Sequence, residues 1–189
     1  MGAISSKSSP AERASLAATM TPAFLEALAA PGPSPLLGAH ADTYGRLIGS
    51  WEGEVHDFPA GAAPTVQAAE VHFAWVLEGR AVQDLWISPP RSGRTPSAAG
   101  RYGTTLRLFR PERGDWQVLW LNPVSGVRCE LVGRREGERV VQVGLRAERP
   151  IRWTFEEIHA ERFLWQGHVL EPDGVTWRLE AEFRMRRRR

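Results

Sequence analysis

The chain has 189 residues with a formal net charge of +2, and 42% of the residues are hydrophobic and 24% charged, so it fits one domain with a single core. These fractions exclude a disordered or fibrous chain, and the single cysteine, Cys129, excludes an internal disulfide and a cysteine-based metal cluster. No apolar run approaches the roughly 20 residues of a membrane-spanning helix, so we expect a cytoplasmic protein without a membrane partner.

Residues 1–38 are predicted to form an N-terminal tail with two short helices and a linker. Ser9-Pro10-Ala11-Glu12 is typical of a capping box and predicts a helix to about Thr19. Thr21-Pro22 repeats the start signal, and Pro31-Gly32-Pro33 ends the second helix. The proline and glycine content of residues 31–38 indicates a linker.

From Leu47 onward the hydrophobic period changes to two, and strand-like segments recur with turn signals between them. We therefore predict an all-β fold, a single antiparallel up-and-down barrel of about ten strands over residues 39–186, with residues 187–189 as a basic tail. The predicted strands are Gly49–Phe58, Val66–Leu77, Ala81–Ile87, Tyr102–Arg110, Trp116–Asn122, Val127–Arg134, Arg139–Leu145, Ile151–Ile158, Arg162–Leu170 and Thr176–Met185.

Most connections between these strands are short and rich in turn-forming residues, as in Pro111–Asp115, Arg135–Glu138 and Glu171–Gly174. The segment Ser88–Gly100 is too long for a tight turn, so it is either a lid at the barrel mouth or a flexible loop. The last six residues include five arginines. Without basic or aromatic patterning elsewhere we interpret them as a solvated end and expect no nucleic-acid partner.

Alternation of apolar and polar residues indicates which face of each strand points inward. The final strand alternates most clearly: we expect Trp177, Leu179, Ala181, Phe183 and Met185 inside, and Arg178, Glu180, Glu182 and Arg184 outside. The same test predicts four further inward sets: Val71, Phe73, Trp75 and Leu77; Trp116, Val118 and Trp120; Ile151, Trp153 and Phe155; and Phe163, Trp165 and Val169.

Tryptophan recurs on these inward faces, and the chain has eight tryptophans, more than an ordinary core requires. The indoles either line an internal cavity or simply fill the barrel, and the sequence leaves both open. If a cavity exists, the residues predicted to bind its ligand are Trp51, Phe73, Trp75, Gln83, Tyr102, Thr104, Trp120, Asn122, Trp153, Trp165 and Phe183.

Polar residues within apolar faces are the candidates for chemistry, because burying them is costly unless they form hydrogen bonds. Gln83, Tyr102, Thr104 and Asn122 are such residues, although each can instead satisfy backbone groups at a strand end. Asp84 and Arg80 share a face with Val82 and Trp86, so the orientation of that strand stays undecided, and Asp84 is a further candidate.

Histidine is the common ligand for haem or zinc and the common base near neutral pH. The chain has five histidines, and none of their spacings is typical of a metal site. His72 and His168 fall on the faces opposite Trp75 and Trp165, so we expect both on the outside. No nucleophile elbow, phosphate-binding loop or dinucleotide fingerprint is present, and we predict neither a metal nor a cofactor.

The runs Leu47–Glu54 (LIGSWEGE) and Phe73–Arg80 (FAWVLEGR), with Gln83-Asp84, resemble the bacterial calycin-like domains of unknown function. These domains are similar in shape to lipocalins, fatty-acid-binding proteins and nitrobindin. The resemblance covers about residues 40–186 and implies a ten-stranded barrel with a short helix before the first strand and a small apolar ligand inside. Nitrobindin-like members bind haem through a histidine near the C-terminus, whereas Thr176–Arg186 contains none.

Three functions follow as hypotheses. The first is a barrel that binds a small hydrophobic or aromatic ligand, with a second copy of the chain kept as a potential partner. The second is a cofactor-independent cyclase or isomerase of bacterial secondary metabolism, an analogy from fold in which Tyr102, Gln83, Asp84 or Asn122 orients or polarises the substrate. The third is a haem protein that uses His72 or His168.

Overall fold

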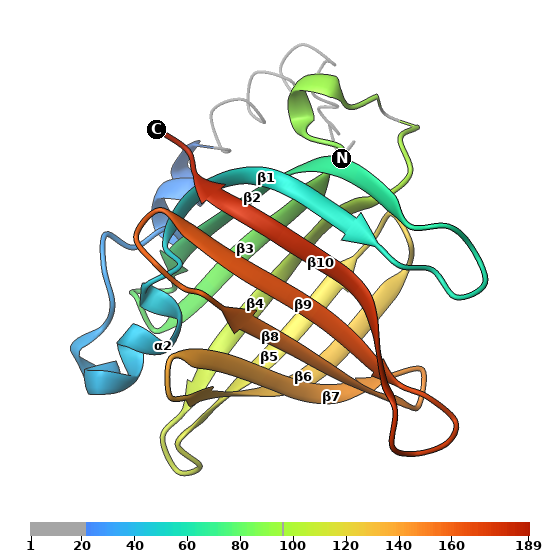
Figure 1. Cartoon of the computed structure of the whole chain (residues 1–189). Helices are drawn as coiled ribbons and strands as arrows, with labels where there is room; N and C mark the ends of the chain where they lie inside the picture. Colours follow the sequence, from blue (N-terminus) through green and yellow to red (C-terminus); the bar gives the residue numbers. More distant parts are fainter. Residues whose placement is uncertain (1–21, 96) are drawn as a thin grey trace, which may run out of the picture.

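The computed structural model describes residues 22–95 and 97–189. Ten strands form one closed antiparallel barrel in which each strand pairs with its neighbours in the sequence and β1 pairs with β10 (Figure 1). This confirms the predicted all-β up-and-down barrel. The strands are β1 (Gly49–Asp57), β2 (Thr65–Val76), β3 (Ala81–Ser88), β4 (Arg101–Arg110), β5 (Asp115–Asn122), β6 (Val127–Glu136), β7 (Arg139–Arg146), β8 (Arg149–Glu156), β9 (Arg162–Leu170) and β10 (Trp177–Arg187).

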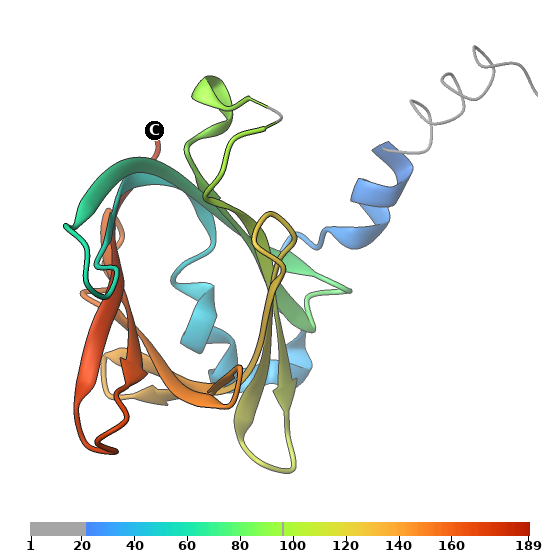
Figure 2. The ribbon, with the colours of Figure 1, turned by 90° about the vertical axis from the view of Figure 1, so that its right-hand side faces the viewer.

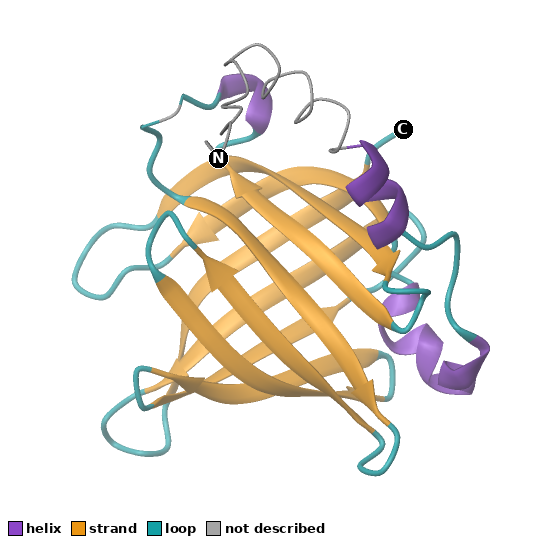
Figure 3. Ribbon diagram, turned by 180° about the vertical axis from the view of Figure 1, so that it is seen from behind, coloured by secondary structure: helices purple, strands orange, loops and turns teal. Residues whose placement is uncertain are grey.

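Most of the helical segments lie at the margins of the barrel (Figure 3). Residues 22–28 are helical, as the second start signal predicts, and the first predicted helix lies outside the described residues. The 3₁₀ helix η1 (Pro35–Ala41) begins inside the segment predicted as a linker and is followed by α2 (Asp42–Gly45), while η2 (Arg91–Gly93) lies between β3 and β4. In the described part of the chain, no helix is long and apolar enough to cross a membrane.

Residues 42–48, which contain α2 and are called the plug below, close the end of the barrel where β1 begins, and Figure 2 shows α2 within the outline of the barrel. Tyr44 and Leu47 are completely buried there. The Tyr44 hydroxyl donates to Gln142 Oε1 at 3.2 Å. Gly133 makes this approach possible, because a Cβ at that position would collide with Tyr44 Oη. A residue without a side chain on β6 therefore allows the helix to enter the barrel.

Three tryptophans pack into this closed half as ordinary core. The Trp51 indole donates to the Leu47 carbonyl at 2.7 Å and meets the Phe163 ring edge-on at 4.9 Å. Trp75 packs beneath α2, and the ring of Trp116 meets Tyr44 edge-on at 5.1 Å. At this end the indoles fill the barrel, as one of the two alternatives predicts.

The inward faces predicted for β2, β5, β8 and β9 are confirmed, with one exception at the end of β2. Val71, Phe73 and Trp75 are all buried in the core. Leu77 is 44% exposed, with a φ of 54°, because the chain reverses toward β3 at this point. The alternation of strand faces ends where the turn begins.

The prediction for β10 is wrong over its first part, because the strand contains a β-bulge. The pairing with β9 shifts between Leu179 and Ala181, so the alternation restarts there. Trp177 and Leu179 consequently lie outside, and Arg178 and Glu180 point into the barrel. A bulge inserts one residue and reverses every face on one side of it, which simple alternation cannot reveal.

Candidate functional site

A cavity of about 620 Å³ occupies the half of the barrel opposite α2. Its lining includes Phe58 just after β1, Gly100 just before β4 and Ser125 between β5 and β6, so it opens among the loops at that end. This volume is typical of sites that enclose a small molecule. The barrel is therefore filled at one end and hollow at the other.

Large aromatic rings form the wall of the cavity and pack on one another. They are Trp86, Trp120, Trp153, Trp165 and Phe183, and their neighbouring centroids lie 4.7 to 6.3 Å apart. Among the described residues, none accepts a hydrogen bond from the indole N–H groups of these four tryptophans. The wall therefore offers flat apolar surface together with unused donors, a combination suited to aromatic or conjugated molecules.

The polar part of the floor comes from β4, through Thr105 and Arg107. The Arg107 side chain is 2% exposed, and its Nη1 donates to Asp84 Oδ2 at 2.5 Å. The other oxygen of Asp84 accepts the backbone N–H of Thr105 at 2.7 Å. Asp84 is thus held behind Arg107 and neutralises its charge, and only the arginine of this pair lines the cavity.

Behind the floor, Arg107 belongs to a network that reaches the α2 plug. Its guanidinium lies 4.8 Å from the centroid of the Tyr44 ring, and its Nε lies 3.4 Å from Gln142 Oε1, which also accepts from Tyr44. Burial raises the pKa of Tyr44 well above its ordinary value, so the hydroxyl stays protonated and remains a donor. The network fixes the closed end to the floor of the cavity.

The mouth of the cavity carries three arginines and two carboxylates. Arg101 pairs with Asp57 through both guanidinium nitrogens of its fork. Arg146 Nη2 donates to Glu180 at 2.6 Å, and Arg178 Nη2 approaches the same carboxylate at 3.4 Å. The bulge in β10 is responsible for this cluster, since it turns Arg178 and Glu180 inward.

Five of the eleven predicted ligand-binding residues line the cavity, namely Trp120, Asn122, Trp153, Trp165 and Phe183. The others are separated from it in two ways. Trp51, Phe73 and Trp75 point inward but belong to the packed core, away from the open half. They satisfy the predicted facing without reaching the hollow part of the barrel.

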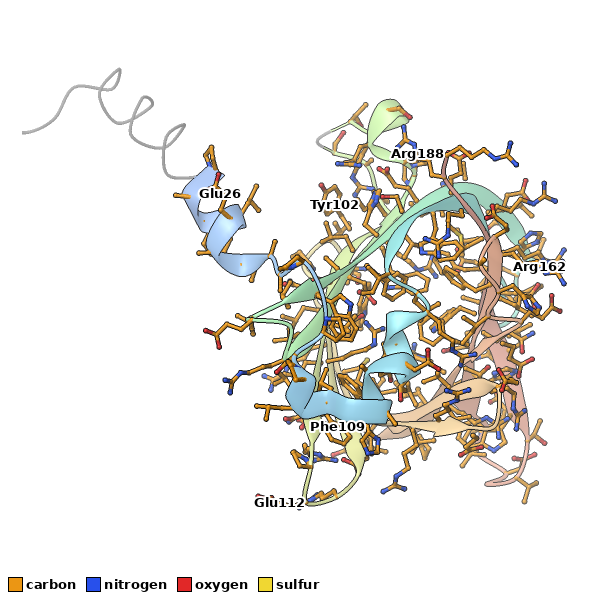
Figure 4. All side chains as sticks on the ribbon, turned by 90° about the vertical axis from the view of Figure 1, so that its left-hand side faces the viewer. Glu26, Tyr102, Phe109, Glu112, Arg162 and Arg188 are labelled. Atoms are coloured by element: carbon orange, nitrogen blue, oxygen red, sulfur yellow. The ribbon has the colours of Figure 1, made fainter. Side chains whose placement is uncertain are left out.

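Gln83, Tyr102 and Thr104 lie on the outer face. The inward facing predicted for Tyr102 and Thr104 is wrong, and the undecided orientation of β3 is resolved with Gln83 outside and Asp84 inside. Gln83 Nε2 donates to Thr104 Oγ1 at 3.0 Å across the outside of β3 and β4, and Tyr102 is 37% exposed at the surface (Figure 4). The alternation of β4 runs opposite to the one expected, since Arg101 and Thr105 line the cavity. Of the four candidate catalytic residues, only Asn122 lines it.

Several lining residues escaped the sequence prediction, namely Asp57, Trp86, Arg101, Thr105, Arg107, Arg146, Arg178 and Glu180. Most are charged, and a charged residue in an alternating strand predicts an outward position. For Trp86 a signal existed, because it shares a face with Val82, but Asp84 on the same face concealed it. Buried ion pairs reverse the usual relation between charge and exposure.

Histidine ligation of haem does not fit this cavity. His72 and His168 lie on the outer faces of β2 and β9, as predicted, and in the described residues no histidine lines the cavity. His72 instead contacts Ser50 Oγ at 3.0 Å and Glu70 Oε2 at 3.2 Å. The described segments also contain no group of three or more histidine, cysteine or acidic side chains able to hold a metal ion.

No family model matches the sequence, and no curated protein matches it. Among solved structures, that of Rv2717c from M. tuberculosis is similar with a TM-score of 0.61 and 16% identity, covering 83% of this chain and 99% of that one. The S-type phycobiliprotein lyase CPES from Guillardia theta is similar with a TM-score of 0.52 and 10% identity, covering 78% of this chain and 91% of that one. At these identities the likeness shows the fold alone, and that fold is the calycin-like barrel expected from the sequence.

Proposed function

We propose that this protein binds a small hydrophobic or aromatic molecule inside the open half of its barrel. The observation that carries the proposal is the cavity of about 620 Å³ whose wall consists of four indoles and one phenyl ring. Transfer of an apolar ligand from water to such a wall is favourable by about 25 cal/mol per Å² of apolar surface buried. Because the rings are packed against one another, the cavity is largely formed before the ligand arrives.

The test uses pyrenebutanamide, a neutral probe whose anisotropy rises on binding and whose pyrene accepts excitation energy from indoles. We expect saturable binding to the wild-type protein. Val127→Trp should weaken it at least tenfold, because Val127 lines the cavity and an indole there occupies ligand volume.

Val143→Trp is the matched control, since Val143 is 47% exposed on the outer face of β7 and its replacement leaves the cavity intact. Circular dichroism checks that both variants are folded. The proposal fails if the probe gives no saturable signal with the wild-type protein, or if a folded Val127→Trp variant binds it as tightly as Val143→Trp does.

A further inference from the structure

We infer that the molecule bound in the cavity is an amphipathic monocarboxylate whose carboxylate pairs with Arg146 at the mouth and whose apolar body contacts the tryptophan wall. This inference rests on the proposed function and specifies its ligand class. It follows from the charges at the mouth and from the hydrogen bonds that each arginine already makes.

The charged residues at the mouth form a network in which one carboxylate serves two arginines. Arg107 at the floor is neutralised by Asp84. At the mouth, Arg101 pairs with Asp57 and Arg146 pairs with Glu180, while Arg178 pairs with both Glu180 and Glu171. An apolar ligand with a single negative charge at this end places that charge beside Arg146 and water while its rings are buried.

The three mouth arginines differ in the donors that remain free. Arg101 is occupied by the Asp57 carboxylate, and Arg178 donates to Glu171, Glu180 and the Phe58 carbonyl. Within residues 22–95 and 97–189, the Arg146 guanidinium makes a single hydrogen bond, from Nη2 to Glu180. Its Nε and Nη1 groups are therefore the donors available to a ligand.

Glu180 does not prevent Arg146 from accepting a second anion, because two arginines share this carboxylate. Arg178 Nη2 lies 3.4 Å from Glu180 Oε1, and Arg146 binds the other oxygen, Oε2. A ligand carboxylate on Arg146 leaves Glu180 paired with Arg178. Charge-assisted hydrogen bonds of this kind are stronger than neutral ones, and partial exposure of Arg146 reduces the gain.

The experiment compares pyrenebutyrate with pyrenebutanamide, which differ only in replacing the carboxylate by a neutral amide. For the wild-type protein we expect about tenfold tighter binding of pyrenebutyrate. Arg146→Gln should abolish this preference, and measurable binding of the amide to the variant shows that the cavity survives the substitution.

Arg152→Gln is the matched control, because Arg152 lies on the outer face of the neighbouring strand β8, with its guanidinium 4.6 Å from the Trp177 ring centroid. It should keep the tenfold preference. Equal affinities of the two probes for the wild-type protein, or a preference retained in Arg146→Gln, overturn the inference while the proposed function stands. If neither probe binds, the proposed function fails and the inference fails with it.

Discussion

Asp84 and Arg107 illustrate how one residue pair can decide the properties of a site. Their side chains are 0% and 2% exposed, and the rings of Tyr44, Phe73 and Phe155 lie around the guanidinium. Burying a charge is costly, and the pair persists because each partner satisfies the other and Asp84 also accepts a backbone N–H. The pair provides a polar floor without adding net charge, so the arginine donors that remain free for a ligand lie at the mouth.

Substituting one partner of this ion pair should lower the free energy of unfolding more than substituting the other. Asp84→Asn leaves a buried guanidinium that cannot lose its proton, and we expect it to lower the free energy of unfolding by about 3–5 kcal/mol. Arg107→Met should cost less, because the Asp84 carboxylate keeps its hydrogen bond from the Thr105 N–H and methionine replaces the apolar part of the arginine side chain. Urea unfolding at pH 7 measures both, with Glu112→Gln in an exposed turn as control. Equal losses in the two variants would contradict this account.

Two irregular elements position the mouth of the cavity. The bulge in β10 turns Arg178 and Glu180 inward, and the segment between β3 and β4 is anchored outside the barrel by Glu70. Glu70 accepts the backbone N–H of Arg91 at 2.7 Å and its Nε at 2.8 Å. The sequence left open whether this segment is a lid or a flexible loop. In the structure its first turn is held to β2 by the hydrogen bonds from Arg91 to Glu70.

The anchor should make stability depend on acid pH. The hydrogen bonds from Arg91 lower the pKa of Glu70 to about 2, so the contribution of the pair is complete above the ordinary glutamate pKa and is lost as the pH falls toward 2. Arg91→Gln should lower the free energy of unfolding by roughly 1 kcal/mol at pH 7, because Arg91 is half exposed.

The difference in the free energy of unfolding between wild type and Arg91→Gln should become smaller as the pH falls from 4.5 to 2. Denaturant unfolding across that pH range measures it. Arg113→Gln, in the exposed turn between β4 and β5, provides the control for a simple loss of positive charge. A difference that stays constant down to pH 2 would exclude Glu70 as the titrating group.

At the scale of the whole molecule, closure of β1 on β10 removes every free sheet edge, and the barrel encloses both core and cavity. The helical residues 22–28 contribute little to this enclosure. Phe24 and Leu25 are 64% and 54% exposed, and a bridge from Ala29 to Val76 connects the segment to β2. We therefore propose that the independent folding unit is the barrel with its plug, close to the predicted range 39–186.

If the barrel with its plug is the folding unit, substitutions in the helix of residues 22–28 should change the free energy of unfolding much less than a substitution in the plug. Phe24→Ser combined with Leu25→Ser should change the free energy of unfolding by less than about 0.5 kcal/mol. Leu47→Ala, at a completely buried position just after α2, should lower it by about 2–5 kcal/mol. Thermal and urea unfolding measure both effects. A large loss from the Phe24 and Leu25 double variant would place the helix inside the folding unit.

Strand number, strand limits and up-and-down order followed from the sequence because they depend on local properties. Alternation with period two and turn residues at short spacing act between neighbours in the chain. The inward position of Trp120, Trp153, Trp165 and Phe183 followed for the same reason. The short helix α2 before the first strand was implied only by the resemblance to calycin-like domains.

The hollow half of the barrel and its charged lining were decided only by the tertiary structure. The plug fills one end because Gly133 leaves space for the Tyr44 side chain, and these two residues are far apart in the chain. Arg107 faces inward because Asp84 on another strand compensates its charge, and Arg178 faces inward because a bulge shifts the register. The alternation of apolar and polar residues depends on the polarity of single residues. The inward positions of Tyr44, Arg107 and Arg178 depend instead on contacts with residues that come close only after the barrel closes.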